Sequence, residues 1–259
     1  MCTNISMMYA TNADDAFWQR DRVNFNLGGF LPGRNTKIRI DSKALGAGTQ
    51  ISAEDDLGME KKTTASRLDF HFRFNQHHRL DSTYYDLTRK SSNLIDKTIQ
   101  YGDEIFVINT TIDSDFNFKV LKLAYTYSFV SNSTLDLGVS AGLFIQDYEI
   151  TLKQTGTGGV EEKADLVAPL PVIGLRGTWA ISHQWWLRSS AELFAIEYDH
   201  YKGRLADIIV SIEHNTFRNV GFGIGYNYTR FKLMSDDDEF LGELKINYSG
   251  LMIYTKMHF

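Results

Sequence analysis

The chain has one cysteine and three prolines in 259 residues, and it contains no long apolar run. Cys2 alone cannot form an internal disulfide. A helix that spans a membrane needs roughly 20 consecutive apolar residues, and no segment approaches that length. Long segments with helical periodicity are also missing. These absences exclude a helical membrane protein and favour a fold built from strands.

The chain also lacks an excess of positive charge. Its formal net charge is −5 and no basic patch with interleaved aromatic residues occurs, which argues against nucleic acid as a partner. What it has instead are 13 Tyr, 17 Phe, 4 Trp and 20 Gly. Many aromatic residues and glycines beside few prolines are typical of a large closed β-sheet.

A strict alternation between residues 67 and 74 gives the clearest strand. Arg67, Asp69, His71 and Arg73 fall on one face, and Leu68, Phe70, Phe72 and Phe74 fall on the other. A period of two residues indicates a strand. In a soluble sheet the apolar face would be the core, whereas in a membrane barrel it faces lipid and the charges face the lumen. We predict the second arrangement.

The end of the chain favours the membrane. Leu251, Ile253, Met257 and Phe259 fall on one side, and the last residue is the aromatic Phe259. A lipid-facing strand hides such a ring in the membrane interface, where aromatic residues are favoured. We therefore predict location in the bacterial outer membrane. The residues read as a membrane-insertion signal are Tyr248, Gly250, Ile253, Met257 and Phe259.

Turn signals and alternation predict an all-β, antiparallel transmembrane barrel of about twelve strands. Clear strands are expected at 22–31, 36–43, 64–75, 78–90, 117–130, 134–153, 167–181, 185–199, 204–214, 219–234 and 241–259. Because single-chain bacterial barrels have an even number of strands, 48–53 is assigned as the twelfth. Residues 22–259 then form one barrel behind an N-terminal arm, 1–21. The arm to about residue 13 resembles the tail of a signal peptide, with a disordered arm as the alternative.

This parse separates short turns from longer, acidic loops. Short periplasmic turns are predicted at 75–77, 130–134, 181–184 and 215–218, and extracellular loops at 54–56, 91–116, 154–162 and 236–239. Aromatic belts are expected at both ends of the strands. The belt beside the turns contains Phe74, Phe129, Trp179, Trp185, Trp186 and Phe222, and the belt beside the loops contains Tyr148, Tyr198, Tyr201, Tyr228 and Phe231.

One hairpin carries a family resemblance. It reads Arg73-Phe-Asn-Gln-His-His-Arg-Leu-Asp81, and Glu54-Asp-Asp-Leu-Gly58 and Phe259 fit the same pattern. With these features the whole chain resembles proteobacterial outer-membrane β-barrel proteins of modest size, including an uncharacterised outer-membrane barrel group. The resemblance implies a location and a fold, and it implies no activity.

The inward positions of the predicted strands carry charges of both signs. The lumen-lining set is Arg67, Asp69, His71, Arg73, Arg79, Asp81, Lys122, Asp136, Arg176, Arg188, Glu192 and Glu213. The same parse also places Lys37, Arg39, Asp41, Glu243 and Lys245 inside. One interpretation is a salt-bridged interior that fixes strand register. The other is a charged constriction in a narrow pore.

We expect a passive role, as a narrow solute channel or a structural envelope protein. One alternative is a hydrolase at the outer rim, where Glu197-Tyr-Asp199-His200 puts a histidine beside acids, although no nucleophile motif accompanies it. Another is an adhesin or surface receptor that presents the 91–116 loop. The acidic loops are either solvated or ligands for Ca²⁺.

No catalytic residue, metal ligand or cofactor is assigned from the sequence. The expected partners are outer-membrane lipid and lipopolysaccharide, the barrel-insertion machinery, and a small solute or ion if the lumen conducts.

Overall fold

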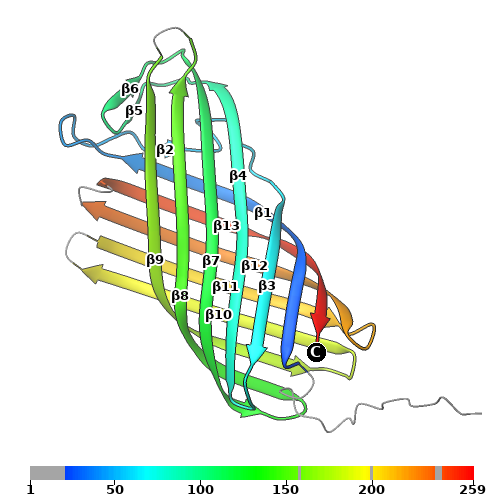
Figure 1. The fold of residues 1–259 in the computed structure, drawn as a ribbon. Coiled ribbons are helices and arrows are strands. Elements are labelled where there is room, and N and C mark those ends of the chain that lie inside the picture. The colour runs from blue at the N-terminus through cyan, green and yellow to red at the C-terminus, as the bar shows by residue number, and fades with distance from the viewer. Residues whose placement is uncertain (1–20, 157–158, 199–200, 237–240) are drawn as a thin grey trace, which may run out of the picture.

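The protein is described by a computed structural model, which covers residues 21–156, 159–198, 201–236 and 241–259. Ten long antiparallel strands form a closed barrel, in which the last strand pairs with the first. They are β1 (Val23–Ile40), β3 (Ala65–Arg73), β4 (His78–Leu94), β7 (Thr111–Ser131), β8 (Leu135–Gln154), β9 (Glu161–Ala180), β10 (Trp185–Tyr198), β11 (Tyr201–His214), β12 (Val220–Asp236) and β13 (Leu241–His258). Figure 1 shows how steeply β10 to β13 lean against the upright β7 to β9. The described residues contain no helix long and apolar enough to cross a membrane.

Side chains alternate between the inside and the outside of the barrel. Along β3, Arg67, His71 and Arg73 are buried, whereas Phe70 and Phe74 are exposed. Charges therefore lie inside and aromatic rings outside, as the strict alternation between 67 and 74 predicted. A soluble barrel would have the opposite arrangement, because it must bury its apolar face.

The prediction of about twelve strands is wrong, and the number is ten. Segments 22–31 and 36–43 are a single strand, β1, which runs through Pro32 without a turn and pairs with β13 along its length. The partner on the other side, β3, ends its pairing at Phe30. Proline lacks an N–H, so it is tolerated at an edge where no partner needs that donor. The predicted strand 48–53 is reduced to β2 (Ile51–Ser52), which pairs briefly with β1 and does not span the barrel.

The continuity of β1 also corrects which of its side chains face inward. Ile38 and Ile40 are buried in the barrel, and Lys37 is exposed on the outside. The interior at this height is apolar, so the assumption that charged residues face inward selects the wrong face of this part of β1. Lys245 lies opposite Lys37 in the register of β13 with β1, and it likewise faces outward.

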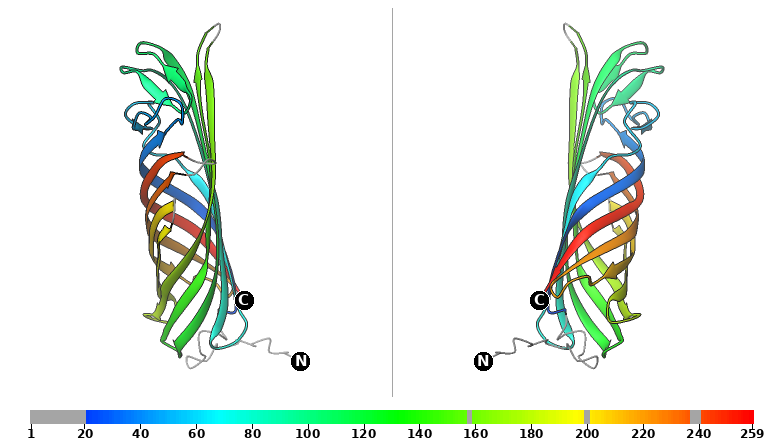
Figure 2. Two further views of the ribbon diagram at one scale, coloured as in Figure 1. Left: turned by 90° about the vertical axis from the view of Figure 1, so that its left-hand side faces the viewer. Right: turned by 90° about the vertical axis from the view of Figure 1, so that its right-hand side faces the viewer.

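Short turns and long connections lie at opposite ends. The turns at 74–77, 132–134, 181–184 and 215–219 lie at the end that holds the C-terminus, and this is the short-turn end (Figures 1 and 2). The opposite, long-loop end carries the connections 41–64 and 95–110. The second contains the hairpin of β5 (Ile99–Tyr101) and β6 (Glu104–Phe106). Several strands begin or end deeper in the predicted loops than expected, so the loop predicted at 91–116 shrinks to 95–110.

The connection 41–64 fills a gap in the barrel wall. Above the short strand β3, no barrel-spanning strand of the described chain lies between the upper parts of β1 and β4. This connection, which includes β2, packs there with Ile51, Leu57 and Met59 buried. Glu54 fixes it in place, because its carboxylate accepts a bond from the Thr36 backbone N–H at 2.8 Å and pairs with Arg89 at 2.6 Å. The first gap in the wall is therefore closed by the protein itself.

Exposed aromatic side chains form the expected belt beside the short turns. Phe74, Phe129, Trp179, Trp185 and Phe222 are about half exposed. Three rings predicted for the belts lie inside the barrel instead, and these are Trp186, Tyr148 and Phe231. The side chains of Tyr198 and Tyr201 are outside the described residues. For Trp186 the assignment failed because neighbouring residues of a strand point to opposite faces, and Trp185 takes the outer one.

Candidate functional site: the charged interior

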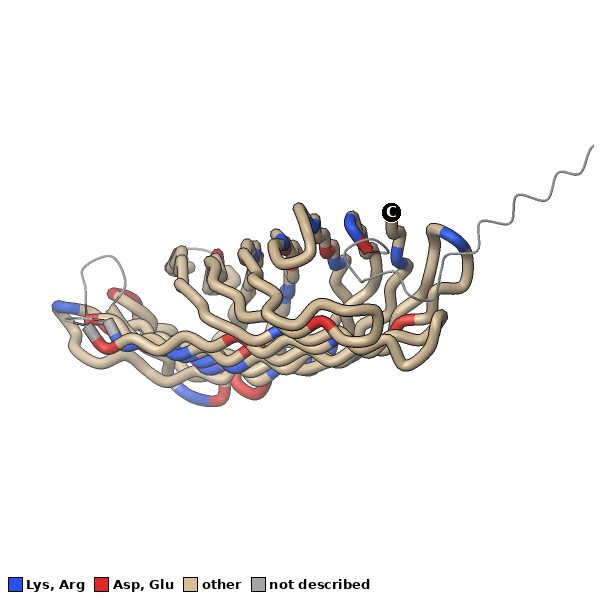
Figure 3. The backbone as a smooth tube through the Cα atoms, turned by 90° about the horizontal axis from the view of Figure 1, so that it is seen from below, with Lys and Arg blue, Asp and Glu red and all other residues tan. Residues whose placement is uncertain are grey.

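The lower half of the barrel, toward the short-turn end, holds a network of charged side chains. Its members are buried or half-buried, and seven are cationic and seven are carboxylates. The cations are Arg67, Arg73, Arg79, Lys122, Arg176, Arg188 and Lys256, and the carboxylates are Asp21, Asp69, Asp81, Asp136, Glu192, Asp207 and Glu213. Viewed from below, charged positions lie on both walls of the flattened barrel (Figure 3). We call this set the interior network.

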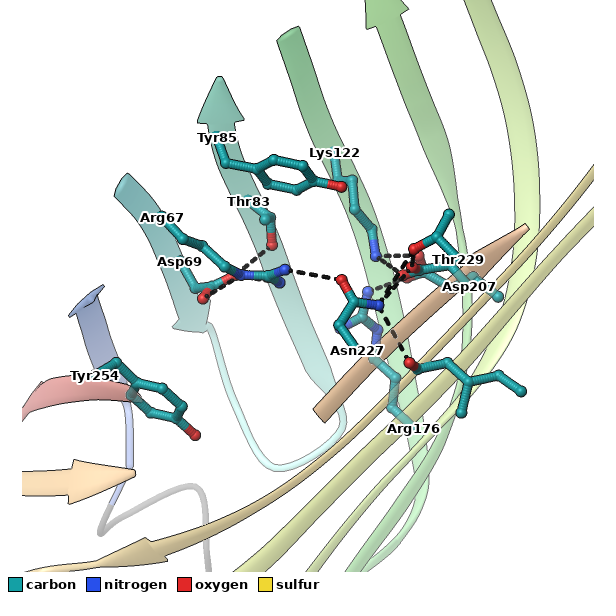
Figure 4. Close-up of polar contacts among 12 residues, drawn as sticks. Arg67, Asp69, Thr83, Tyr85, Lys122, Arg176, Asp207, Asn227, Thr229 and Tyr254 are labelled. Atoms are coloured by element: carbon teal, nitrogen blue, oxygen red, sulfur yellow. Dashed lines mark hydrogen bonds and ion pairs between the residues drawn. The ribbon is translucent and has the colours of Figure 1, made fainter. Parts of the chain in front are cut away.

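One part of the interior network joins opposite walls through Asn227. Arg67 pairs with Asp69 at 2.9 Å on β3 and donates to the Asn227 side-chain oxygen at 3.2 Å. The Asn227 amide in turn donates to Asp207 on β11 at 2.8 Å. Figure 4 shows this bridge across the lumen, with Thr229 also donating to Asp207.

Lys122 lies at the centre of the interior network. Its ammonium group is 2.6 Å from Glu192 on β10 and 2.7 Å from Asp207 on β11. Glu192 also accepts a bond from Arg176. Because two carboxylates and two cations alternate here, each charge is compensated by at least one of opposite sign.

Two further arginines pair close to the short turns. Arg79 lies 3.0 Å from Asp81, which also accepts a bond from Thr126 at 2.8 Å. Arg73 lies 2.9 Å from Asp136, near the start of β8. The Arg73–Asp136 pair connects β3 with β8, and the Thr126–Asp81 bond connects β7 with β4.

Asp21, which precedes β1, caps the interior network from below. It contacts Arg188, His71 at 3.1 Å and Lys256 at 3.6 Å. Glu213 lies on the other side of the same cations, 2.8 Å from both Arg188 and Lys256. The last residue of the predicted arm is therefore part of the barrel interior, whereas residues 1–20 lie outside the described chain.

A layer of six aromatic rings lies above the interior network. The rings come from six strands, and each is at most 2% exposed: Phe30, Tyr85, Phe118, Tyr148, Phe231 and Tyr248. Phe118 stacks on Tyr148 with ring centroids 4.7 Å apart, and Tyr148 stacks on Phe231 at 5.8 Å. The hydroxyls of Tyr85 and Tyr248 are hydrogen-bonded at 2.5 Å. We call this set the aromatic layer.

A small cavity lies beside the interior network. It has a volume of about 110 Å³ and lies among Asn24, Asp69, Arg79 and Glu213, below the aromatic layer. That volume holds a few water molecules. The rings of the aromatic layer, each at most 2% exposed, do not line this cavity.

The structure places all twelve lumen-lining residues predicted from the sequence on the inner face. Three charged members of the interior network were missed, namely Asp21, Asp207 and Lys256. The signal for Asp207 was present, because it shares the face of Glu213 on one strand. Of the predicted insertion signal, Tyr248 and Gly250 face inward, and Ile253, Met257 and Phe259 face outward.

The other candidate sites have ordinary partners. Glu197 pairs with Lys202 across the β10–β11 hairpin, while Asp199 and His200 lie outside the described residues. In the connection 41–64, Asp55 pairs with Lys61 at 3.0 Å, and this contact lowers the pKa of the Asp55 carboxyl. Asp56 pairs with Lys97 at 2.7 Å. Among the described residues, no group of three His, Cys, Asp or Glu side chains is arranged to hold a metal ion.

Comparisons with known proteins support the fold. No family model and no curated protein matches the chain. The outer membrane protease OmpT from Escherichia coli is similar with a TM-score of 0.61 at 10% sequence identity, over 93% of this chain and 98% of that chain. Ail, the attachment invasion locus protein of Yersinia pestis, gives 0.40 at 11% identity, covering 91% of this chain and 99% of that chain. Neisserial surface protein A gives 0.38 at 11% identity, covering 91% and 97%.

At 10% identity the likeness to OmpT shows the fold and brings no activity to this chain. The fold agrees with the polarity of the lower barrel, where apolar and aromatic side chains are exposed and the charges are inside. The chain is a modest-sized integral β-barrel of the bacterial outer membrane.

Proposed function

We propose that this protein is a closed, non-conducting barrel with a structural role in the outer membrane. The observation that carries the proposal is the pairing of every arginine predicted to line a pore. Arg67, Arg73, Arg79, Arg176 and Arg188 each contact at least one carboxylate. A cationic constriction needs charges that are free to meet passing ions.

The aromatic layer supports the same conclusion from a different direction. Its rings reach from β7 and β8 on one wall to β12 and β13 on the other, and they are almost completely buried. An ion that crosses this layer would leave its hydration shell without gaining polar ligands, which is very costly. A barrel of ten strands is also narrower than porins of 16 to 18 strands.

The orientation follows from the two ends of the barrel. The start of β1, the C-terminus and the short turns lie together, and short turns face the periplasm in barrels of this type. The connections 41–64 and 95–110 would then face the cell exterior. In this orientation the protein holds a compact, loop-covered end outside the membrane.

Planar-bilayer recordings test the proposal. The purified wild type is expected to give no stepwise current, with an open porin in the same bilayers as the positive control. The double variant R176A/R188A is expected to remain silent as well, because the aromatic layer above these residues is intact. Stable wild-type channels whose ion selectivity changes in the double variant would show that the lumen conducts.

A second role, in surface binding, is favoured by the 95–110 connection. Ile105, Val107 and Ile108 are about half exposed at the long-loop end, although isoleucine and valine normally avoid such positions on loops. Cells that display the wild type would then adhere to epithelial cells better than cells that display I105S/V107S/I108S. Equal adhesion at equal surface expression would remove this role.

A further inference from the structure

The wall of the barrel has a second gap, between β9 and β10. The two strands pair from Ala180 with Trp186 up to Ile173 with Leu193, and their pairing stops there. Above that point β9 continues from 172 back to 161 with β8 as its only strand neighbour among the described residues. Figure 1 shows β9 rising upright while β10 leans away. We call this gap the seam.

Two prolines of β9 lie at the seam. Pro169 and Pro171 lie in β9 just beyond its last pair with β10. Proline cannot donate to a ladder and therefore belongs at strand edges. The edge of β9 is thus built so that it stays unpaired.

Unlike the first gap, the seam is not filled by the described part of the chain. A crevice of about 900 Å³ opens there, within the range of small-molecule pockets. Its apolar wall includes Ile173, Leu193, Phe194 and Leu205, and Phe194 packs against the apolar core of the barrel. A gap that runs from the outer surface to the core needs an apolar occupant, because the apolar side chains that line it would otherwise be left uncovered.

The upper border of the crevice is cationic. Arg204, Arg230 and Lys232 line it from the outer face of β11 and β12. Strand register extends this edge into a row, because Arg204 lies opposite Lys232, Lys232 opposite Lys245, and Lys245 opposite Lys37. Like charges directly opposite one another on neighbouring strands repel. Among the described residues, the carboxylate that pairs with cations of this row is Glu243, which lies 3.1 Å from Lys232 and 2.8 Å from Lys245.

The cationic row lies at the edge of the apolar band. Below Arg204 the next outward positions on β11 are Ala206, Ile208 and Val210, and below Arg230 those on β12 are Tyr228 and Tyr226. Apolar and aromatic outward residues mark the part of the strand in contact with lipid, and the charges above them therefore lie at headgroup level.

From these features we infer that the seam binds a phosphorylated, multiply acylated lipid of the outer leaflet. One acyl chain fills the crevice beside Ile173 and Phe194, and the lipid phosphates neutralise Arg204, Arg230 and Lys232. The row of four cations covers three strand spacings, about 14 Å, which is wider than one phosphate, so the headgroup that fits carries two phosphates. The choice of leaflet rests on the orientation proposed above.

The test uses the purified full chain in detergent and diphosphoryl lipid A as the probe, with binding followed by native mass spectrometry. The seam variant R204Q/R230Q/K232Q removes the cations, and K90Q/K119Q removes two exposed lysines from the opposite wall as a matched control. The seam variant is expected to bind about 100-fold more weakly, since each cation at an anionic lipid surface contributes about a factor of five. The control is expected to bind like the wild type.

A second variant tests the crevice without changing charge. A206W fills it from β11, and we expect weaker binding of lipid A but an unchanged heat-modifiable barrel. The inference is overturned if the seam variant binds within twofold of the wild type, if K90Q/K119Q loses as much affinity, or if dephosphorylated lipid A binds equally well. Loss of binding in both the seam variant and A206W, with K90Q/K119Q unchanged, supports it. Because binding is measured in detergent, conduction in bilayers would refute the closed barrel without affecting this result.

Discussion

Replacement of Lys122 by methionine tests how strongly the interior network stabilises the barrel. Lys122 is almost fully buried, and its ammonium group lies 2.6 Å from Glu192 and 2.7 Å from Asp207. Methionine keeps the unbranched apolar stem and removes the charge. The substitution therefore leaves two buried carboxylates with one cation fewer, while the volume of the side chain changes little.

The expected cost follows from what remains around the two carboxylates. Removing one partner of a buried ion pair costs about 3–5 kcal/mol. Glu192 keeps Arg176, and Asp207 keeps its bonds from Asn227 and Thr229. We therefore expect K122M to lower the free energy of unfolding by about 3 kcal/mol, at the lower end of that range.

The measurement is urea unfolding in lipid vesicles, followed by tryptophan fluorescence. K119M is the matched control, because Lys119 lies on the same strand, on the outer face, and is exposed. Exposed ion pairs contribute about 0–1 kcal/mol, so this variant should unfold almost like the wild type. A loss below about 1 kcal/mol in K122M, or an equal loss in both variants, would show that the buried pairs do not stabilise the barrel.

Two other substitutions test packing and assembly. G223A should destabilise the barrel by about 1–3 kcal/mol, because a Cβ there would overlap the Tyr254 ring and displace its hydroxyl from Glu213. In the control variant G29A the added Cβ meets open space, so this variant should unfold like the wild type. Equal urea midpoints for the two variants would contradict this packing. F259A keeps the backbone bonds between Phe259 and Val23 but removes the exposed ring, so we expect a smaller heat-modifiable fraction in the outer membrane. F217A, which removes an exposed ring from a short turn, serves as its control, and similar folded fractions for the two would end the reading of Phe259 as an insertion signal.

Local alternation was enough to predict the faces of most strands. The charges between 67 and 73 face inward because a period of two leaves only one choice once the polarity of the barrel is known. The same rule failed in the upper barrel, where Ile38 and Ile40 face inward and Lys37 faces outward. The interior there is apolar, so a rule that places charges inside selects the wrong face.

Strand number and charge pairing were beyond local reasoning for a different reason. Pro32 reads as a turn from its neighbours, and it is tolerated in a strand only because β3, from another part of the chain, ends beside it. The partners of Lys122 come from β10 and β11, at least 70 residues away in the sequence. Such pairs depend on barrel closure and shear, which one sequence does not specify.

The interior network also constrains the order of assembly. Lys122 on β7 meets its carboxylates only when β10 and β11 are in place, and Asp21 meets Arg188 across 167 residues of chain. Arg67 and Asp69 pair within one strand, but Arg73 and Lys122 reach their carboxylates only on strands outside their own hairpins. A sheet that inserted hairpin by hairpin would therefore carry uncompensated ions. These charges are fully matched only when β13 joins β1 and the ring closes. Closure is thus the step that completes the ion pairs of the interior network, and a barrel that has not closed keeps the electrostatic cost of the unpaired charges.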